Sequence, residues 1–107
     1  MSKRQDKVNE LLRQLASEFI SKESNRLSLI TVTHVDVSRD LKNATIYVSI
    51  YPEESETAGL DFLKRNLGDL RDYVKPKLNM KNIPFFDCKL DMGEKNRQTI
   101  ENLSHNS

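Results

Sequence analysis

The chain has 107 residues, of which 36% are hydrophobic and 31% are charged, and its formal net charge is +1. This length suits one compact core, so we expect a single domain over residues 1–107 with frayed ends at 1–4 and 104–107. The single cysteine excludes an intramolecular disulfide and a multi-cysteine zinc site. No apolar run approaches the roughly 20 residues that span a bilayer, and the polar start lacks a secretory signal pattern. We therefore expect a cytoplasmic protein without a membrane partner.

The first half of the chain predicts a helix followed by a β-hairpin. Residues 5–22 carry apolar side chains at helical spacing, namely Val8, Leu11, Leu12, Leu15 and Phe19. The β-branched run 29–37 predicts a strand, and its change of phase at 33–34 indicates a bulge. After a polar turn, strict alternation over 44–51 predicts the second strand of a hairpin, which Pro52 ends.

The segment after the hairpin predicts two helices or one broken helix. The first covers 56–66, and leucine and valine spacing then resumes after Gly68. We place the break at 66–69, because asparagine and aspartate cap helices and glycine tolerates the φ angle that a sharp break needs. Pro76 should kink or shorten the second helix.

The last part of the chain predicts a third strand and a short final helix. Phe86, Cys88 and Leu90 alternate with polar or exposed positions, and 93–103 has helical spacing. The order α-β-β-α-α-β-α indicates an α+β fold with a three-stranded sheet and the helices on one face. The helical crossover between the second and third strands allows these two strands to be parallel.

The sequence offers little for catalysis. His34 has no metal-ligand spacing around it, so a structural or surface role is favoured. Cys88 is in phase with apolar neighbours and is expected in the core. Nothing in the spacing of the aspartates forces two of them into one cleft. We therefore expect a protein that is not an enzyme and that uses no cofactor and no metal.

Charge is unevenly distributed along this nearly neutral chain. Residues 64–81 hold six basic and two acidic side chains, a net charge of +4, whereas 53–61 hold four acidic side chains and no basic one. A helix that starts near Gly68 would present free N–H groups and a positive dipole end to a phosphate. An ordinary solvated helix face also explains such a basic run.

Several segments in order carry a resemblance to a known family. They are an opening amphipathic helix, an S-x-D-L turn at 38–41, a G-x-[IL]-R helix start at 68–71 and an L-x-[LM]-[RK]-x-x-P approach at 78–84. From 4 to 103 the chain resembles ribosome-binding factor A, a family of assembly factors of the small ribosomal subunit. That resemblance implies a type II KH-like domain in which a helix-kink-helix with A-x-G replaces the G-x-x-G loop. Asn66-Leu67-Gly68 is the matching tripeptide, with asparagine in place of alanine.

The resemblance also implies a function. The chain would bind 16S rRNA of the small (30S) subunit, support late processing of precursor rRNA without catalysis, and be needed most in the cold. Neighbouring ribosomal proteins are further expected partners, and the free protein is expected to be a monomer. The residues that we expect at the RNA are Lys64, Arg65, Asn66, Gly68, Arg71, Lys75, Lys77 and Lys81, with Arg39 and Lys42 on the hairpin turn and Arg4 at the N-terminus.

A second function stays open at this stage. A KH-like module that binds proteins and never contacts RNA fits the net charge of +1, because many free-standing RNA-binding domains are far more basic. Salt separates the two functions, since phosphate binding weakens steeply as salt rises.

Overall fold

A computed structural model describes residues 3–23 and 29–93, and for Lys3, Arg4 and Glu23 it describes the backbone alone. The elements are α1 (Lys3–Glu23), β1 (Leu29–Val37), β2 (Asn43–Tyr51), the 3-10 turn η1 (Glu53–Ser55), α2 (Glu56–Arg65), α3 (Leu67–Val74), the 3-10 turn η2 (Lys75–Lys77) and β3 (Phe85–Leu90). Every helix and strand predicted within the described ranges is present. The expected final helix over 93–103 lies, apart from Gly93, outside them.

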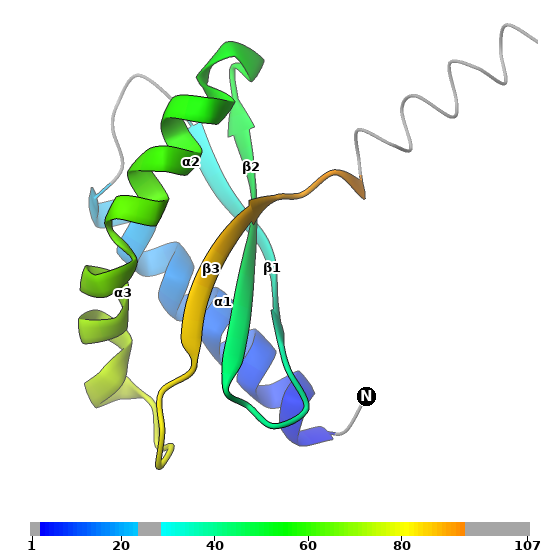
Figure 1. Ribbon diagram of the computed structural model, residues 1–107, viewed down its shortest axis with the longest axis vertical. Coiled ribbons are helices and arrows are strands. Elements are labelled where there is room, and N and C mark those ends of the chain that lie inside the picture. Colours follow the sequence, from blue (N-terminus) through cyan, green and yellow to red (C-terminus); the bar gives the residue numbers. More distant parts are fainter. Residues whose placement is uncertain (1–2, 24–28, 94–107) are drawn as a thin grey trace, which may run out of the picture.

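The three strands form one mixed sheet in the order β1-β2-β3 (Figure 1). β1 and β2 are antiparallel, and their register shifts between Val32 and His34, so the predicted bulge is confirmed. β2 and β3 are parallel, with Asn43 opposite Phe85 and Val48 opposite Leu90. A parallel pair needs a long crossover, and here α2 and α3 supply it.

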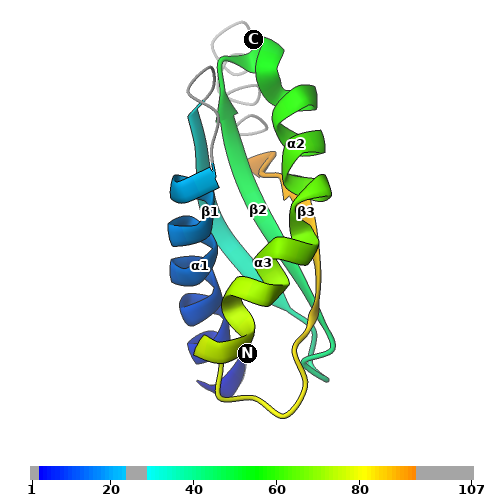
Figure 2. The same ribbon diagram turned by 90° about the vertical axis from the view of Figure 1, so that its left-hand side faces the viewer.

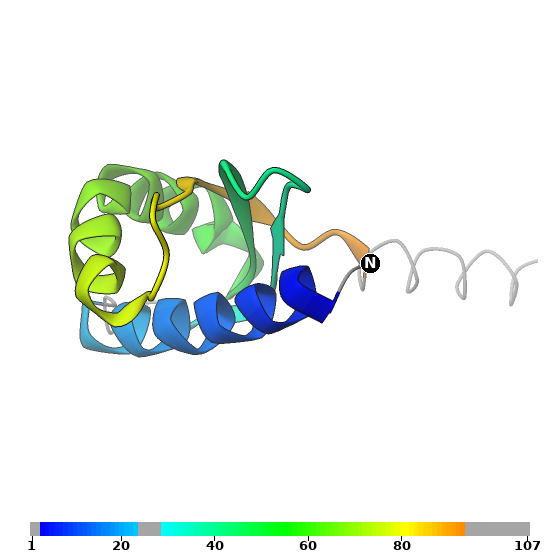
Figure 3. The same ribbon diagram turned by 90° about the horizontal axis from the view of Figure 1, so that it is seen from below.

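All three helices cover one face of the sheet. Figure 2 shows α1 and the α2–α3 pair side by side in front of the strands, and Figure 3 shows the same layers from below. The buried residues of β2 are the predicted alternating set, Ala44, Ile46, Val48 and Ile50. The opposite face of the sheet has no helix over it among the described residues. The predicted architecture, α+β with its helices on one face, is therefore confirmed for the described elements.

The buried face of α1 differs slightly from its predicted stripe. Leu12, Leu15 and Phe19 are buried as expected, but Leu11 is 38% exposed and Ile20 is buried instead. At about 100° per residue, Leu11 lies at one edge of the apolar arc of α1 and Ile20 lies beyond the other edge. The packing of α1 on β1 and α3 turns the helix so that Ile20 is buried and Leu11 faces solvent.

Candidate nucleic-acid interface

Asn66 makes the kink between α2 and α3. Its backbone has φ −102° and ψ 10°, and its N–H donates to the carbonyl oxygens of Leu63 (3.0 Å) and Phe62 (3.2 Å). Its side-chain Nδ2 also donates to the Phe62 oxygen at 2.7 Å, while its own carbonyl accepts from Leu70 N at 2.9 Å. Asn66 therefore ends one helix and begins the next. The predicted helix-kink-helix is present.

Gly68 does not have the backbone role that the sequence suggested. Glycine was expected to supply an unusual φ at the break, but none of the described glycines has a positive φ. Gly68 is the second residue of α3, is exposed, and a Cβ built on it would meet no atom within 4 Å. The kink comes from Asn66, and the expectation for Gly68 was wrong because any L-residue can adopt this helical conformation.

Pro76 shortens α3 as predicted. The regular helix ends at Val74, and the chain continues as the 3-10 turn η2 over Lys75–Lys77. Proline cannot donate a backbone hydrogen bond, and its ring clashes with a preceding carbonyl inside a helix. The tighter turn changes the direction of the chain and leads it into the segment that precedes β3.

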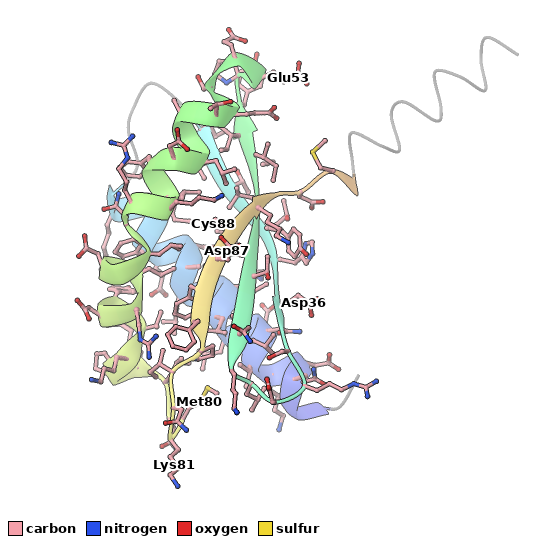
Figure 4. All side chains as sticks on the ribbon, in the orientation of Figure 1. Asp36, Glu53, Met80, Lys81, Asp87 and Cys88 are labelled. Atoms are coloured by element: carbon pink, nitrogen blue, oxygen red, sulfur yellow. The ribbon has the colours of Figure 1, made fainter. Side chains whose placement is uncertain are left out.

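Six cations follow this helical layer toward one end of the molecule. We call them the basic ridge; its members are Lys64, Arg65, Arg71, Lys75, Lys77 and Lys81. All except Arg71, which is half-buried, are exposed. Figure 4 shows Lys81 at the tip of the loop before β3 and Glu53 at the opposite end of the layer. The two ends of the layer therefore carry opposite charge, while Asp61, Asp69 and Asp72 lie on the helices between them.

Arg71 is partly engaged within the fold. Its Nη2 donates to the carbonyl oxygen of Ile83 at 3.3 Å, and its guanidinium carbon lies 4.9 Å from the centroid of the Phe85 ring. A guanidinium group has five N–H donors, so most of them remain for another acceptor. Arg71 thus joins α3 to the start of β3 and still contributes its full charge to the surface.

The Tyr73 ring on α3 contacts Lys77 of the basic ridge and also Lys22 of α1. The Nζ atoms of Lys77 and Lys22 lie 4.3 Å and 5.0 Å from the Tyr73 ring centroid, and the Tyr73 hydroxyl donates to Glu18 Oε2 at 2.9 Å. Lys22 was not among the predicted site residues. Its approach depends on α1 packing beside α3, which the sequence pattern did not fix.

The hairpin turn lies at the same end of the molecule as Lys81. Phe85 N donates to the Lys42 carbonyl oxygen at 2.8 Å, and both Arg39 and Lys42 are exposed. Asp40 holds the turn, because its Oδ1 accepts from Ser38 Oγ at 2.6 Å and from Lys42 N at 3.0 Å. These hydrogen bonds, that of Ser38 first, lower the pKa of Asp40.

The predicted residue Arg4 lies on α1, and its side chain is outside the described part. Val37 at the end of β1 bonds to α1 through its N–H, which donates to Asn9 Oδ1 at 2.9 Å, and through its carbonyl oxygen, which accepts from Gln5 Nε2 at 3.3 Å. The first turns of α1 are thereby tied to the end of β1, from which the hairpin turn leaves. The structure thus brings the backbone of Arg4 to the end of the molecule that carries Lys42.

The open face of the sheet has a different character. His34 stacks on Tyr47 with ring centroids 4.4 Å apart and 12° between planes, and its Nδ1 is 3.7 Å from Asp91 Oδ2. Asp36 and Asp87 are both in register with Thr45, and they occupy the strands on either side of β2 (Figure 4). These carboxylates make this face a poor surface for phosphates.

The described residues contain little that could perform chemistry. Burial raises the pKa of the Cys88 thiol to about 12, Asp87 adds to that shift, and Lys64 opposes it. A thiol with such a pKa is not a nucleophile at neutral pH. Within residues 3–23 and 29–93, no group of three His, Cys, Asp or Glu residues could hold a metal ion, and no helix is long and apolar enough to cross a membrane.

Sequence comparisons find relatives of this chain that share one name. The family described as Ribosome-binding factor A matches residues 4–104. The ribosome-binding factor A of Thermomicrobium roseum is 33% identical over 105 residues, which cover 95% of this chain and 81% of that relative. That of Macrococcus caseolyticus is 29% identical over 111 residues, covering 97% of each chain.

Solved structures share the fold at low sequence identity. The crystal structure of ribosome-binding factor A from Thermus thermophilus superposes with a TM-score of 0.72 at 22% identity, over 80% of this chain and 94% of that one. A homology model of the Thermus thermophilus factor, fitted into the cryo-EM map of its complex with the 30S subunit, gives a TM-score of 0.66 at 22% identity, over 78% and 90% of the two chains. The family match spans almost the whole sequence, and on that basis the chain belongs to the ribosome-binding factor A family.

Proposed function

We propose that this protein is an assembly factor of the small ribosomal subunit that binds 16S rRNA and supports late processing of its precursor. It acts by binding and uses no cofactor. It is a cytoplasmic monomer of one domain, and it is needed most in the cold. Family membership and the homology model of a relative fitted into the map of a 30S complex support the ribosomal part of this proposal. The observation that carries the RNA part is the basic ridge.

The position and the charge of the basic ridge suit contact with a phosphate backbone. Five of its members lie on α2, α3 and η2, and Lys81 lies on the loop that follows. The hairpin turn is next to the end of that loop, where Phe85 N donates to the Lys42 carbonyl oxygen. Phosphate contacts fix the position of a protein on RNA without reading sequence. Specificity would then come from the shape of the rRNA at the docking site.

Co-sedimentation with ribosomal subunits tests this function. Purified protein is mixed with immature small subunits, mature small subunits or large subunits, at low and at high salt. We expect salt-sensitive association with small subunits, stronger with immature ones, because neutralised phosphates release counterions. No association with any subunit would refute the proposal.

A matched pair of variants locates the contact. Lys75→Glu with Lys81→Glu alters two exposed ridge cations, whereas Arg13→Glu with Lys89→Glu makes the same change in total charge elsewhere. We expect the ridge variant to weaken binding about tenfold and to flatten its salt dependence, and the control to bind as the wild type does. Equal losses in both variants would mean that net charge, and not the ridge, determines binding.

The open sheet face supports a second function, docking of a protein. Its carboxylates, and the stack of the exposed His34 on the half-buried Tyr47, would suit a basic protein segment better than RNA. If this face alone binds the subunit, Asp36→Lys with Asp87→Lys would abolish co-sedimentation and the ridge variant would not. The two functions are therefore separable in the same assay.

A further inference from the structure

Phe85 is a large apolar side chain that the fold leaves outside the core. It is the first residue of β3, and its side chain is 68% exposed, whereas Cys88 farther along the strand is buried. Phe85 pairs with Asn43 at one end of β2. A single exposed apolar residue is common on protein surfaces, so its surroundings decide what it means.

One cation, Arg71, packs on this ring, and Lys42 and Lys81 lie on the segments next to Phe85. The Arg71 guanidinium lies over it at 4.9 Å, and the carbonyl oxygen of Lys42 accepts from Phe85 N at 2.8 Å. The loop that carries Lys81 leads directly into Phe85 (Figure 4). An aromatic face beside cations is the combination with which proteins bind unpaired nucleotides, because the ring stacks on the base while the cations neutralise phosphates.

The geometry of this pair is fixed before any ligand arrives. Arg71 is held by its bond to the Ile83 carbonyl oxygen, and the Phe85 backbone is held by Lys42. A ring and a guanidinium that are already in place lose little conformational freedom when a base stacks on them. The guanidinium covers part of the ring, and the remaining exposed surface is accessible to a base.

An apolar protein partner fits this position less well. Two of the other large exposed apolar side chains, Leu29 and Tyr51, are paired with each other at the far end of β2, and Met92 follows the far end of β3. Phe85 therefore does not extend a contiguous apolar patch of the kind that marks protein interfaces. Its ring contacts the Arg71 guanidinium, and its partner on β2 is the polar residue Asn43.

We propose that Phe85 and Arg71 form a stacking site for one unpaired nucleobase, with Lys42 and Lys81 neutralising the adjacent phosphates. This inference rests on the proposed function, since it assumes that the ridge binds rRNA. It adds a structural feature of the ligand: the RNA at this end of the protein has a base that is not paired. A continuous duplex would contact the ridge but not this site.

Fluorescence of an adenine analogue tests the inference. The probe is a single-stranded RNA of about ten nucleotides with a central 2-aminopurine, which loses fluorescence when it stacks. We expect wild-type protein to quench the probe in a saturable titration. Phe85→Leu keeps an apolar side chain but removes the aromatic face, and should weaken binding about tenfold and abolish the quenching.

Three comparisons complete the experiment. Phe85→Trp should restore both affinity and quenching, which separates stacking from loss of fold. Tyr51→Leu removes a similarly exposed ring at the other end of β2 and should leave the titration unchanged. A fully paired duplex of the same length should bind wild type and Phe85→Leu equally. Its binding is measured by competition with a labelled duplex.

The outcomes distinguish this inference from the proposed function. If the wild type binds neither RNA, and also fails to sediment with small subunits, the proposed function fails and the stacking site fails with it. If both RNAs bind but Phe85→Leu behaves as wild type, or Tyr51→Leu causes the same loss, only the stacking site is refuted. If Phe85→Leu weakens the duplex as much as the single strand, the ring has a structural role and the inference is again refuted.

Discussion

Two glycines in adjacent helices give a matched test of how α2 is seated on the sheet. Gly59 on α2 is buried, and a Cβ built there would lie 2.8 Å from Ile50 Cδ1 and 3.1 Å from Ile50 Cγ2. Gly68 on α3 is exposed, and its Cβ would meet nothing within 4 Å. The same substitution, glycine to alanine, should therefore have opposite effects at the two positions.

The magnitudes follow from two opposing terms. Alanine stabilises a helix relative to glycine by up to about 1 kcal/mol, and this gain applies at both positions. Overpacking a core costs about 1–3 kcal/mol, and it applies at Gly59 alone. We expect Gly59→Ala to lower the free energy of unfolding by about 1 kcal/mol and Gly68→Ala to raise it by about 0.5 kcal/mol. The smaller gain at Gly68 reflects its place in the first turn of α3.

Urea unfolding, followed by circular dichroism, measures both changes, and a double-mutant cycle identifies the cause. Ile50→Val removes the nearest clashing methyl group, Cδ1, so its combination with Gly59→Ala should be more stable than the sum of the single changes. An additive double variant, or a Gly59→Ala protein as stable as Gly68→Ala, would refute the close approach of α2 to β2. Because α2 carries the start of the basic ridge, such a result would also move the proposed RNA contact.

Three further predictions concern single side chains. Arg71→Gln should lower the free energy of unfolding by about 1 kcal/mol in urea, since it loses a hydrogen bond and a cation–π contact, whereas Lys75→Gln should change it by less than about 0.5 kcal/mol. The pKa of Asp40 is lowered in the fold, so its carboxylate contributes stability above the unfolded pKa of about 4 that is lost as pH falls through the folded value. The melting temperature of the wild type should therefore be higher than that of Asp40→Asn at neutral pH. A difference in melting temperature that persists at pH 2 would contradict this. Cys88, with its pKa raised to about 12, should resist thiol reagents at pH 8 until urea is added; rapid labelling of the folded protein would show that it is not buried.

The sheet was the most predictable part of the fold. Alternation in β2 identified its buried face, and the phase change in β1 located the bulge at Val32–His34, because a strand has a strict period of two. The hairpin turn was predicted only as a polar segment. Leu41 there has φ 61°, a left-handed conformation that leucine seldom adopts and that its residue type does not signal.

The kink in the candidate site was predictable from the sequence, but the contacts around it were not. The kink was placed correctly from Asn66 and Gly68, but the choice between them needed the Asn66 side chain, which donates to Phe62. Arg71 was predicted as a free phosphate ligand, whereas it also holds Ile83 and Phe85. Those contacts join residues more than ten positions apart, and they depend on how the loop before β3 folds back. Local periodicity carries no information on contacts between residues so far apart in the sequence.

A net charge near zero does not argue against RNA binding by this chain. The field at a surface depends on how charges are arranged at distances comparable to the Debye length, about 8–10 Å at physiological salt. Here Glu53 and Lys81 lie at opposite ends of one helical layer (Figure 4). Asp61 lies one helical turn from Lys64 and Arg65, and Asp69 and Asp72 lie on α3, so charge is partly balanced in the middle of the layer. The exposed Lys75, Lys77 and Lys81 follow these carboxylates, and a phosphate at that end meets an excess of positive charge. The same separation gives the molecule a dipole along the layer, which would orient the basic end toward RNA before contact.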